Sequence, residues 1–476
     1  MHMGKWTGNK PDTQRGAQWA QPPPYVETGP GEWVVEGGGS LPLGSEFWDE
    51  LWTNMSAFGL QTFKLDHVEQ QIPEMNYTNR DVMAVENWLT DMTDSAWRHG
   101  IYKEYGGHYS NGVLHSVTLQ GATSARVSDD YIPGVKRPKG SCETLLPVAQ
   151  QQRVTPRGNV LLSSNTLYPW SVGLLPYRDA FFSGTQSWST CTCLQGNTGP
   201  ESAATSLKPE WWGLQEGIPE LQALVAALTA GPIAPGDGIG DTDVDLVMRT
   251  CRKDGILLKP SRPIFPIDSW WTGNALGSSG PSPRGSQLNL DHGAAEVGYT
   301  FEEINGLRWY FVLGVGLEKA FDLTPGDVHL APGSGNSTQW QWSWDCAARG
   351  CTRPSSDPAD VSLEPFGVDR PIRLPPFVDG AHGAMSWARL RFTRTAPTLC
   401  NGWLLLGETE KFISVSRSRI LDLAVDCGEG GGLVVQVGGA PGETVTMLLR
   451  PPRGGAVVAR SCTAGQDGKC SIAAGG

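Results

Sequence analysis

The chain has 476 residues, a length that predicts two or three domains with a substantial hydrophobic core. Charged residues make up only 18% of it, and 60 glycines and 35 prolines predict long irregular loops between regular elements. The formal net charge of −12, with no Lys/Arg cluster, argues against nucleic acid or an anionic membrane as a partner, and no apolar run approaches the roughly 20 residues that span a bilayer.

The ten cysteines and the glycosylation motifs indicate in which cellular compartment the protein is found. Cys346/Cys351 and Cys462/Cys470 bracket short polar loops, which favours local disulfides and a secretory-pathway, extracellular or vacuolar location. Three sequons favour the same location: Asn54, Asn76 and Asn336. The first thirty residues nevertheless show no signal-peptide pattern. The 19 tryptophans allow two explanations, stacking on sugar rings and packing in the core.

The first regular elements follow a polar segment. Residues 10–43 are rich in Pro, Gly, Gln and Thr and predict a long loop. Residues 47–58 have apolar positions at helical spacing and predict a helix, as do residues 82–99. Between these helices, the short, mostly apolar run 60–65 predicts a buried strand that ends immediately before Asp66.

Strands and helices continue to alternate through the first half. The next expected elements are strands at 101–105, 124–127 and 170–176 and a helix at 221–228. Residues 140–158 and 187–213 are rich in Gly, Ser, Gln and Pro and predict inserted loops. The alternation predicts a parallel sheet, and carboxylates that recur after the strands indicate a (β/α)8 TIM-type barrel with its site on that face.

After Trp271 the pattern changes to strands separated by turn residues. The expected strands are 307–315, 388–393, 403–406, 433–437 and 444–449. They predict an antiparallel β-sandwich domain over residues 272–476, after an α/β barrel domain over residues 1–271.

Two acidic loops follow predicted strands, one with Asp66 and one with Asp129 and Asp130. A retaining glycosidase needs two carboxyl groups about 5–5.5 Å apart, one as nucleophile and one as acid/base. Asp66 and Asp129 are about two βα units apart, so strands two apart around a barrel rim would carry them. An isolated Asp in such a loop more often caps a helix, so spacing alone does not decide the role.

Several segments resemble one enzyme family. Residues 59–66 resemble the G-v-d-x-v-K-v-D strand of the raffinose synthase and α-galactosidase family of glycoside hydrolases, which have clan D barrels. Residues 125–133 are similar to its R-x-S-D-D-F-x-P segment, and residues 176–181 to its P-D-W-D-M-F loop. Weaker matches at 230–233 and 254–259 follow in the family's order.

The resemblance implies a retaining glycosidase or transglycosidase that acts on α-galactosides of the raffinose type and needs no cofactor or metal. It makes Asp66 the nucleophile. We assign Asp129 as the acid/base and Asp130 as a structural or sugar-binding carboxylate, although spacing does not fix which of the two is the acid. The other side chains implied to bind the sugar are Lys64, Arg126, Asp179, His67, Trp6 and Asp237. Water and a second sugar both stay open as acceptors.

The chain departs from the family pattern in three places. Tyr177 and Arg178 replace the first Asp and the Trp of the P-D-W-D loop, and Pro235-Gly236-Asp237 replaces an S-D pair, which puts the substrate in doubt. Residues 2–6 resemble a strand end one βα unit before the nucleophile, which implies that the chain begins partway through the barrel and lacks its first strands. The competing interpretation is therefore an inactive or truncated relative that only binds carbohydrate.

Metal motifs are not recognisable. Counting an EF-hand from Asp241 places Leu246 and Arg252 where Gly and Glu are required, so helix capping is the expected role of these acidic residues. Cys191 and Cys193 have no companion pair at zinc-ligand spacing.

Overall fold

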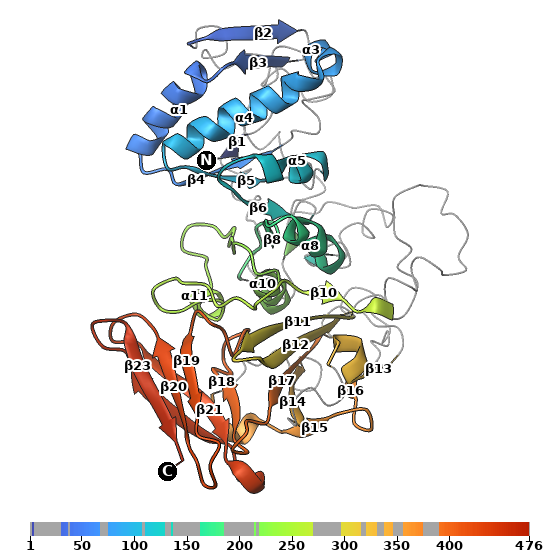
Figure 1. Ribbon diagram of the computed structural model, residues 1–476, viewed down its shortest axis with the longest axis vertical. Coiled ribbons are helices and arrows are strands. Elements are labelled where there is room, and N and C mark those ends of the chain that lie inside the picture. The colour runs from blue at the N-terminus through green and yellow to red at the C-terminus, as the bar shows by residue number, and fades with distance from the viewer. Residues whose placement is uncertain are drawn as a thin grey trace. The chain divides into compact units, whose positions relative to one another are not determined.

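The computed structural model describes fourteen stretches of the chain, residues 2–3, 30–36, 39–66, 75–106, 110–128, 135–136, 162–184, 214–215, 219–269, 297–315, 320–330, 338–345, 356–374 and 390–475. They belong to two compact units, which are described separately (Figure 1). Unit 1 comprises residues 1–130, 165–179 and 196–208, and unit 2 comprises the remainder. The domain boundary expected at residue 271 stays a prediction.

Unit 1 contains a parallel sheet with the strand order β1-β4-β5-β6-β8. Its strands are β1 (His2–Met3), β4 (Thr62–Leu65), β5 (Tyr102–Tyr105), β6 (Ala122–Arg126) and β8 (Leu175–Tyr177). The parallel sheet expected in the first half of the chain is thus confirmed, and β1 lies beside β4 as the motif order predicts. Closure of these strands into an eight-stranded barrel stays a prediction.

The two long helices of unit 1 occur where the apolar periodicity predicts them. Helix α1 is Glu46–Ala57 and helix α4 is Val82–Arg98. Each is followed by a glycine with positive φ, Gly59 at 82° and Gly100 at 71°, a conformation that is strained for residues with a Cβ atom. The shorter α-helices of the described part of the unit are α3 (Asn76–Arg80), α5 (Ser110–His115) and residues 165–171 of α8 (Leu162–Ser171).

Two predictions about unit 1 are wrong. The end of the expected loop at 10–43 is a hairpin of β2 (Glu32–Glu36) and β3 (Gly39–Leu43), because its Trp-Val-Val core has high β-propensity that the polar composition of the whole segment hides. The expected strand at 170–176 begins as the end of α8, and only Leu175–Tyr177 is strand. Periodicity does not distinguish a short buried strand from a buried helix end.

Aromatic side chains form the core on the helix side of the sheet. Trp33, Phe47, Trp48, Trp52 and Phe63 contact one another in sequence, with ring centroids 4.6–6.0 Å apart. Trp52 is fully buried and donates its indole N–H to the Met92 carbonyl at 3.1 Å. Burial of one such large apolar side chain stabilises a fold by about 1.5–3 kcal/mol. Core packing therefore accounts for this group of tryptophans.

Unit 2 combines helices α10 (Pro219–Leu228) and α11 (Val244–Met248) with antiparallel sheets. The largest sheet has the order β10-β11-β12-β17-β14-β15, and two three-stranded sheets have the orders β18-β21-β22 and β19-β20-β23. The strands of these sheets are β10 (Phe265–Pro266), β11 (Val297–Ile304), β12 (Leu307–Val315), β14 (Gln339–Asp345), β15 (Glu364–Phe366), β17 (Leu390–Pro397), β18 (Leu404–Gly407), β19 (Ile420–Val425), β20 (Leu433–Gly438), β21 (Thr444–Arg450), β22 (Val458–Thr463) and β23 (Lys469–Ala474). Strands β13 (Phe321–Leu323) and β16 (Ile372–Leu374) form a separate pair, as do β7 (Val135–Lys136) and β9 (Leu214–Gln215).

The two three-stranded sheets share one hydrophobic core, the arrangement of a β-sandwich. Leu405 and Met447 come from one sheet, and Leu423, Val435 and Ile472 come from the other. All five predicted strands of this half of the chain are present, within a few residues of the expected bounds.

Disulfides cross-link the antiparallel part of unit 2. The predicted Cys462–Cys470 bond is present and joins β22 to β23. A second bond, Cys400–Cys427, joins positions 27 apart in the sequence and is not predicted. Cys346 and Cys351 lie outside the described residues. Within the described ranges, no helix is both long enough and apolar enough to cross a bilayer.

Candidate functional site

Strand β4 presents its side chains alternately to two sides of the sheet. Phe63 and Leu65 are buried in the aromatic core beside α1 and α4. Lys64, between them, projects to the opposite face because successive side chains of a strand alternate. Asp66 follows the strand directly and is 8% exposed. The family motif therefore places its lysine and its aspartate at the carboxyl end of a sheet strand, where parallel α/β sheets bind their ligands.

Asp179 joins the ends of three strands. Its Oδ2 atom lies 3.1 Å from Nη1 of Arg126, the last residue of β6, and its Oδ1 atom lies 3.7 Å from Nζ of Lys64. The backbone N–H of Asp179 donates to the Ser128 hydroxyl at 2.9 Å. The three charged side chains are 10–22% exposed. We call Lys64, Asp66, Arg126 and Asp179 the strand-end cluster.

Gly106 allows Lys64 and Asp66 to approach the end of β5. A Cβ atom at this glycine would lie 2.6 Å from Cε of Lys64 and 2.8 Å from Cγ of Asp66. Both distances are far below ordinary van der Waals contact. The Gly106 N–H also donates to the Leu65 carbonyl at 2.7 Å, which fixes the backbone next to Asp66. Sequence analysis did not single out this glycine, although its place directly after a strand was a signal.

Glu104 is a second residue that sequence analysis missed. It pairs in register with Lys64 on the neighbouring strand. Burial raises the pKa of the Tyr177 hydroxyl, and a hydrogen bond with Glu104 raises it further, so this hydroxyl stays protonated. The Tyr105 carbonyl, 3.1 Å from the Tyr177 hydroxyl oxygen, is a second acceptor for the same proton. Tyr177, which departs from the motif of the resembled family, is therefore a buried structural residue. Its neighbour Arg178 is only 1% exposed.

The helix face of β5 carries a buried cation. Lys103 is fully buried, and its Nζ atom lies 3.2 Å from the Tyr105 hydroxyl and 4.3 Å from the centre of that ring. Among the described residues, no carboxylate forms an ion pair with Lys103. Burial lowers its pKa from 10.5 to about 7.

The other predicted site residues lie elsewhere. Four of them are outside the described residues: Asp129, Asp130, His67 and Trp6. Asp237 belongs to unit 2, where its two carboxylate oxygens accept hydrogen bonds from the Ser183 backbone and hydroxyl at 2.8 and 2.6 Å. Asp243 caps α11 by accepting from the Leu246 N–H, as expected of this acidic segment. The described residues contain no group of three or more side chains suited to a metal ion.

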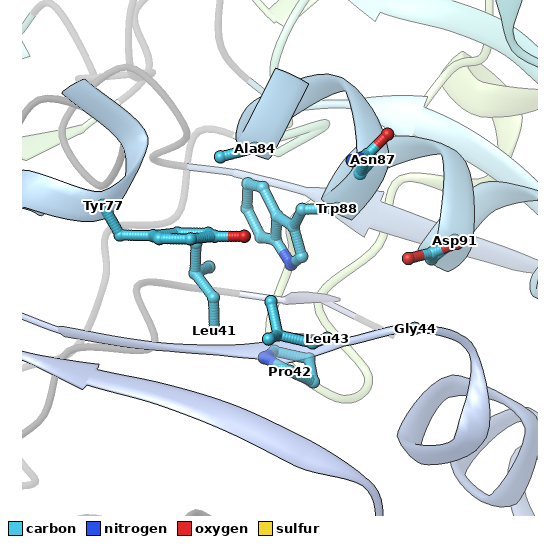
Figure 2. Close-up of a pocket in the computed structure, with 9 residues that line it drawn as sticks. All are labelled: Leu41, Pro42, Leu43, Gly44, Tyr77, Ala84, Asn87, Trp88 and Asp91. Atoms are coloured by element: carbon cyan, nitrogen blue, oxygen red, sulfur yellow. The ribbon is translucent and has the colours of Figure 1, made fainter. Parts of the chain in front are cut away.

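Two pockets are present away from the strand-end cluster. One, of about 380 Å³, lies in unit 1 between β3, α3 and α4 (Figure 2). The other, of about 450 Å³, lies in unit 2 and is lined by residues 259–261, 301–303 and 416–418. The second pocket contains Glu302, which is 2% exposed and accepts a hydrogen bond from Ser261 at 2.6 Å.

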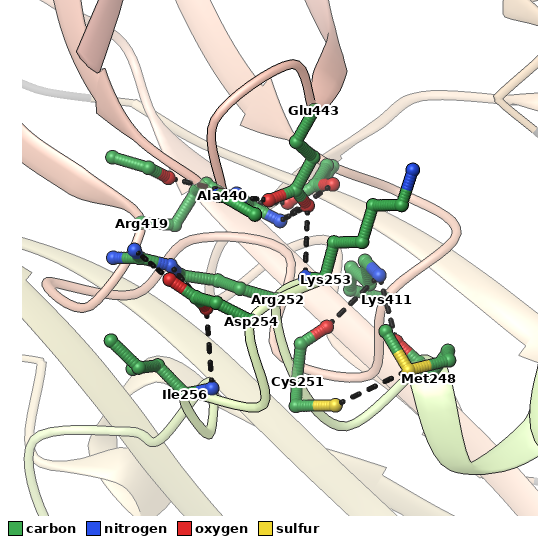
Figure 3. A network of polar contacts seen from close by, with 12 residues as sticks. Met248, Cys251, Arg252, Lys253, Asp254, Ile256, Lys411, Arg419, Ala440 and Glu443 are labelled. Carbon is green, nitrogen blue, oxygen red and sulfur yellow. Dashed lines mark hydrogen bonds and ion pairs between the residues drawn. The ribbon is translucent and has the colours of Figure 1, made fainter. Parts of the chain in front are cut away.

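A charged network inside unit 2 joins the loop after α11 to the β-sandwich (Figure 3). Arg419 donates to Glu408 and to Glu443, each at 2.7 Å, and to the Gly438 carbonyl at 2.8 Å. Glu443 also accepts from the backbone N–H groups of Lys253 and Ala440. We call Arg419, Glu408 and Glu443 the sandwich network.

The chain is similar to known proteins in structure and not in sequence. No family model matches the chain, and no curated protein sequence matches it. Among solved structures, the chain is similar to a GH27 β-L-arabinopyranosidase from Geobacillus stearothermophilus, with 10% sequence identity and a TM-score of 0.41. The match covers 78% of this chain and 66% of the arabinopyranosidase. Likeness at this level carries no argument about function, so the case rests on the chain's own residues.

Proposed function

We propose that the chain is a retaining glycosidase or transglycosidase of the clan D barrel type that acts on α-galactosides such as raffinose-family oligosaccharides. One observation carries the proposal. Lys64, Arg126 and Asp179, which the motif resemblance assigns to the sugar site, come from separate strands and lie together at one edge of a parallel sheet, where Asp66 also ends β4. Charged hydrogen-bonding groups at such an edge suit a polyhydroxylated ligand.

In the proposed mechanism, Asp66 attacks the anomeric carbon while Asp129 protonates the departing oxygen. A covalent galactosyl ester on Asp66 results. Asp129 then takes a proton from water or from a sugar hydroxyl, the freed oxygen attacks the anomeric carbon, and the carboxylate of Asp66 leaves. Two inversions give net retention. Lys64, Arg126 and Asp179 hold the sugar hydroxyls, and Asp130, His67 and Trp6 are further proposed contacts.

Release of nitrophenol from nitrophenyl α-galactoside tests the proposal. Asp66→Asn removes the nucleophile and should lower turnover by on the order of 10⁴-fold or more, the scale seen when a covalent nucleophile is lost. Asp94→Asn is the matched control, because Asp94 lies on α4, outside the strand-end cluster, and its turnover should stay at the wild-type level. Equal rates for wild type and Asp66→Asn would contradict the role of Asp66.

Product stereochemistry tests the mechanism separately. The sugar released first, followed by proton NMR before mutarotation, should be the α-anomer. The β-anomer would indicate single displacement, in which Asp66 activates water instead of attacking carbon. Binding of raffinose without any turnover would favour the competing interpretation, an inactive carbohydrate-binding relative.

A further inference from the structure

The pocket in unit 1 is formed by three elements: β3, α3 and α4. It is lined by Leu41–Gly44 of β3 and its following turn, Tyr77 of α3, and Ala84, Asn87, Trp88 and Asp91 of α4 (Figure 2). Its volume of about 380 Å³ falls within the range of roughly 300–1,000 Å³ typical of small-molecule sites. Among the described residues, no member of the strand-end cluster lines it.

Trp88 contributes a hydrogen-bond donor that the described residues leave unused. The side chain is 4% exposed, and its Nε1 atom is buried without a hydrogen-bond partner. Figure 2 shows this nitrogen directed toward the β3 side of the pocket, near Pro42 and Leu43. The buried indoles of Trp52 and Trp309 donate to backbone carbonyls, whereas the Nε1 atoms of Trp33, Trp48 and Trp342 are buried without a partner, as in Trp88. Of these partnerless indoles, Trp88 lines the pocket. Most buried polar groups have a partner, so an unused N–H beside a pocket indicates a ligand.

Asp91 supplies an acceptor in the same pocket. Figure 2 shows its carboxylate turned toward Trp88. Burial raises the pKa of Asp91 above its ordinary value, and the hydrogen bond from the Gly44 backbone opposes this only in part. The pocket therefore offers the Trp88 donor and the partly buried Asp91 acceptor, with the Asn87 amide and the Tyr77 hydroxyl also in its lining. The rings of Tyr77 and Trp88 and the side chains of Leu41 and Pro42 supply its apolar part.

This combination disfavours anions and suits a neutral ligand with hydroxyl groups on one edge and C–H groups on its face. The Asp91 carboxylate repels phosphate and other anions, and no trio of metal ligands lies among the described residues. A pyranose ring has the required edge and face, because its C–H groups pack against aromatic rings while its hydroxyls both donate and accept. We propose that this pocket is a second, non-catalytic site for a neutral sugar unit. The choice of a sugar over other neutral molecules rests on the proposed function.

Fluorine NMR on full-length protein labelled with 5-fluorotryptophan tests the site directly. The Trp88 resonance is assigned as the one that is present in the wild-type spectrum and absent from the spectrum of Trp88→Phe. Titration of Asp66→Asn protein with raffinose should shift this resonance saturably, and sodium phosphate should leave it unmoved. Introducing Asp91→Asn into the Asp66→Asn protein should weaken the fitted affinity for raffinose by about 5- to 10-fold, the effect of one lost hydrogen bond. Added Glu86→Gln is the control, because Glu86 is exposed on α4 and does not line the pocket.

The outcomes separate this site from the catalytic proposal. A Trp88 resonance that raffinose does not move, or equal affinity in Asp91→Asn and Glu86→Gln, would overturn the pocket assignment even if Asp66→Asn is inactive. A saturable, Asp91-dependent shift would support the pocket even if Asp66→Asn keeps full turnover, an outcome that would instead defeat the proposed function.

Discussion

The strand-end cluster and the sandwich network both combine arginine with carboxylates, but they differ in burial. Arg419 and Glu408 are at most 4% exposed as side chains, and each branch of Arg419 has an acceptor. In the strand-end cluster, the Asp179 carboxylate pairs with two cations, one of them at 3.7 Å, and the side chains of Lys64, Arg126 and Asp179 are 10–22% exposed. The first arrangement is closed to solvent, whereas the second leaves donors and acceptors within reach of a ligand.

The comparison indicates that the sandwich network stabilises the fold, whereas the strand-end cluster is suited to binding a ligand. Breaking a fully buried pair leaves an uncompensated charge in the interior. Breaking a partly exposed pair leaves a charge that water can reach, so its effect on folding is small. Substitutions in the sandwich network should therefore lower stability, whereas substitutions in the strand-end cluster should lower turnover with little effect on stability.

The largest expected effect is on stability in unit 2. Arg419→Met leaves Glu408 and Glu443 buried without their cation and should lower the free energy of unfolding by about 3–5 kcal/mol, measured by chemical denaturation. Arg460→Met, on exposed β22, is the matched control and should stay within about 0.5 kcal/mol of wild type. Similar losses for both variants would remove the distinction between the two clusters.

The next effect concerns turnover. Asp179→Asn withdraws the charge that Lys64 and Arg126 share and should lower kcat/KM for nitrophenyl α-galactoside by about 100-fold, or about 2.7 kcal/mol. The free energy of unfolding should fall by no more than about 1 kcal/mol, because the ion pairs are partly exposed. A large loss of stability with unchanged kcat/KM would show that Asp179 is structural.

Gly106→Ala should have a smaller effect on the same reaction. The added methyl group displaces the side chains of Lys64 and Asp66 from the end of β5, so kcat/KM should fall by about tenfold. Gly428→Ala is a control on an exposed loop of unit 2. If kcat/KM of Gly106→Ala equals that of this control, the close approach at Gly106 has no role in turnover.

The smallest expected effect concerns Lys103, a buried lysine that belongs to neither cluster. Lys103 has a folded pKa of about 7, below its ordinary 10.5, so the unfolded chain binds the extra proton between these values and stability rises with pH across that window. Lys103→Met removes this dependence. Its stability advantage over wild type should shrink by about 1 kcal/mol between pH 7.5 and 8.5, measured by urea denaturation. A constant difference would show that Lys103 does not titrate there.

Sequence patterns predicted what depends on local periodicity and motif order. The helices that follow the hairpin, the strands around Lys64 and Arg126, and three of the six sandwich strands, β18, β20 and β21, were expected from the sequence pattern. Glu104 and Gly106 were missed because their importance comes from the register of β4 against β5, which no single strand encodes. The Cys400–Cys427 bond was missed for a similar reason, since tertiary packing brings these distant positions together.

The Ser128 hydroxyl that accepts the Asp179 N–H has a practical consequence for protein engineering. Together with the pairing of Arg126 and Tyr177, it ties the ends of β6 and β8 directly to each other. The geometry of Asp179 is therefore set by the strands and not by the length of the chain that connects them. We expect the hydrogen bond between Ser128 and Asp179 to be retained when residues are inserted into or removed from the segment 137–161, so the site can be kept while that segment is redesigned.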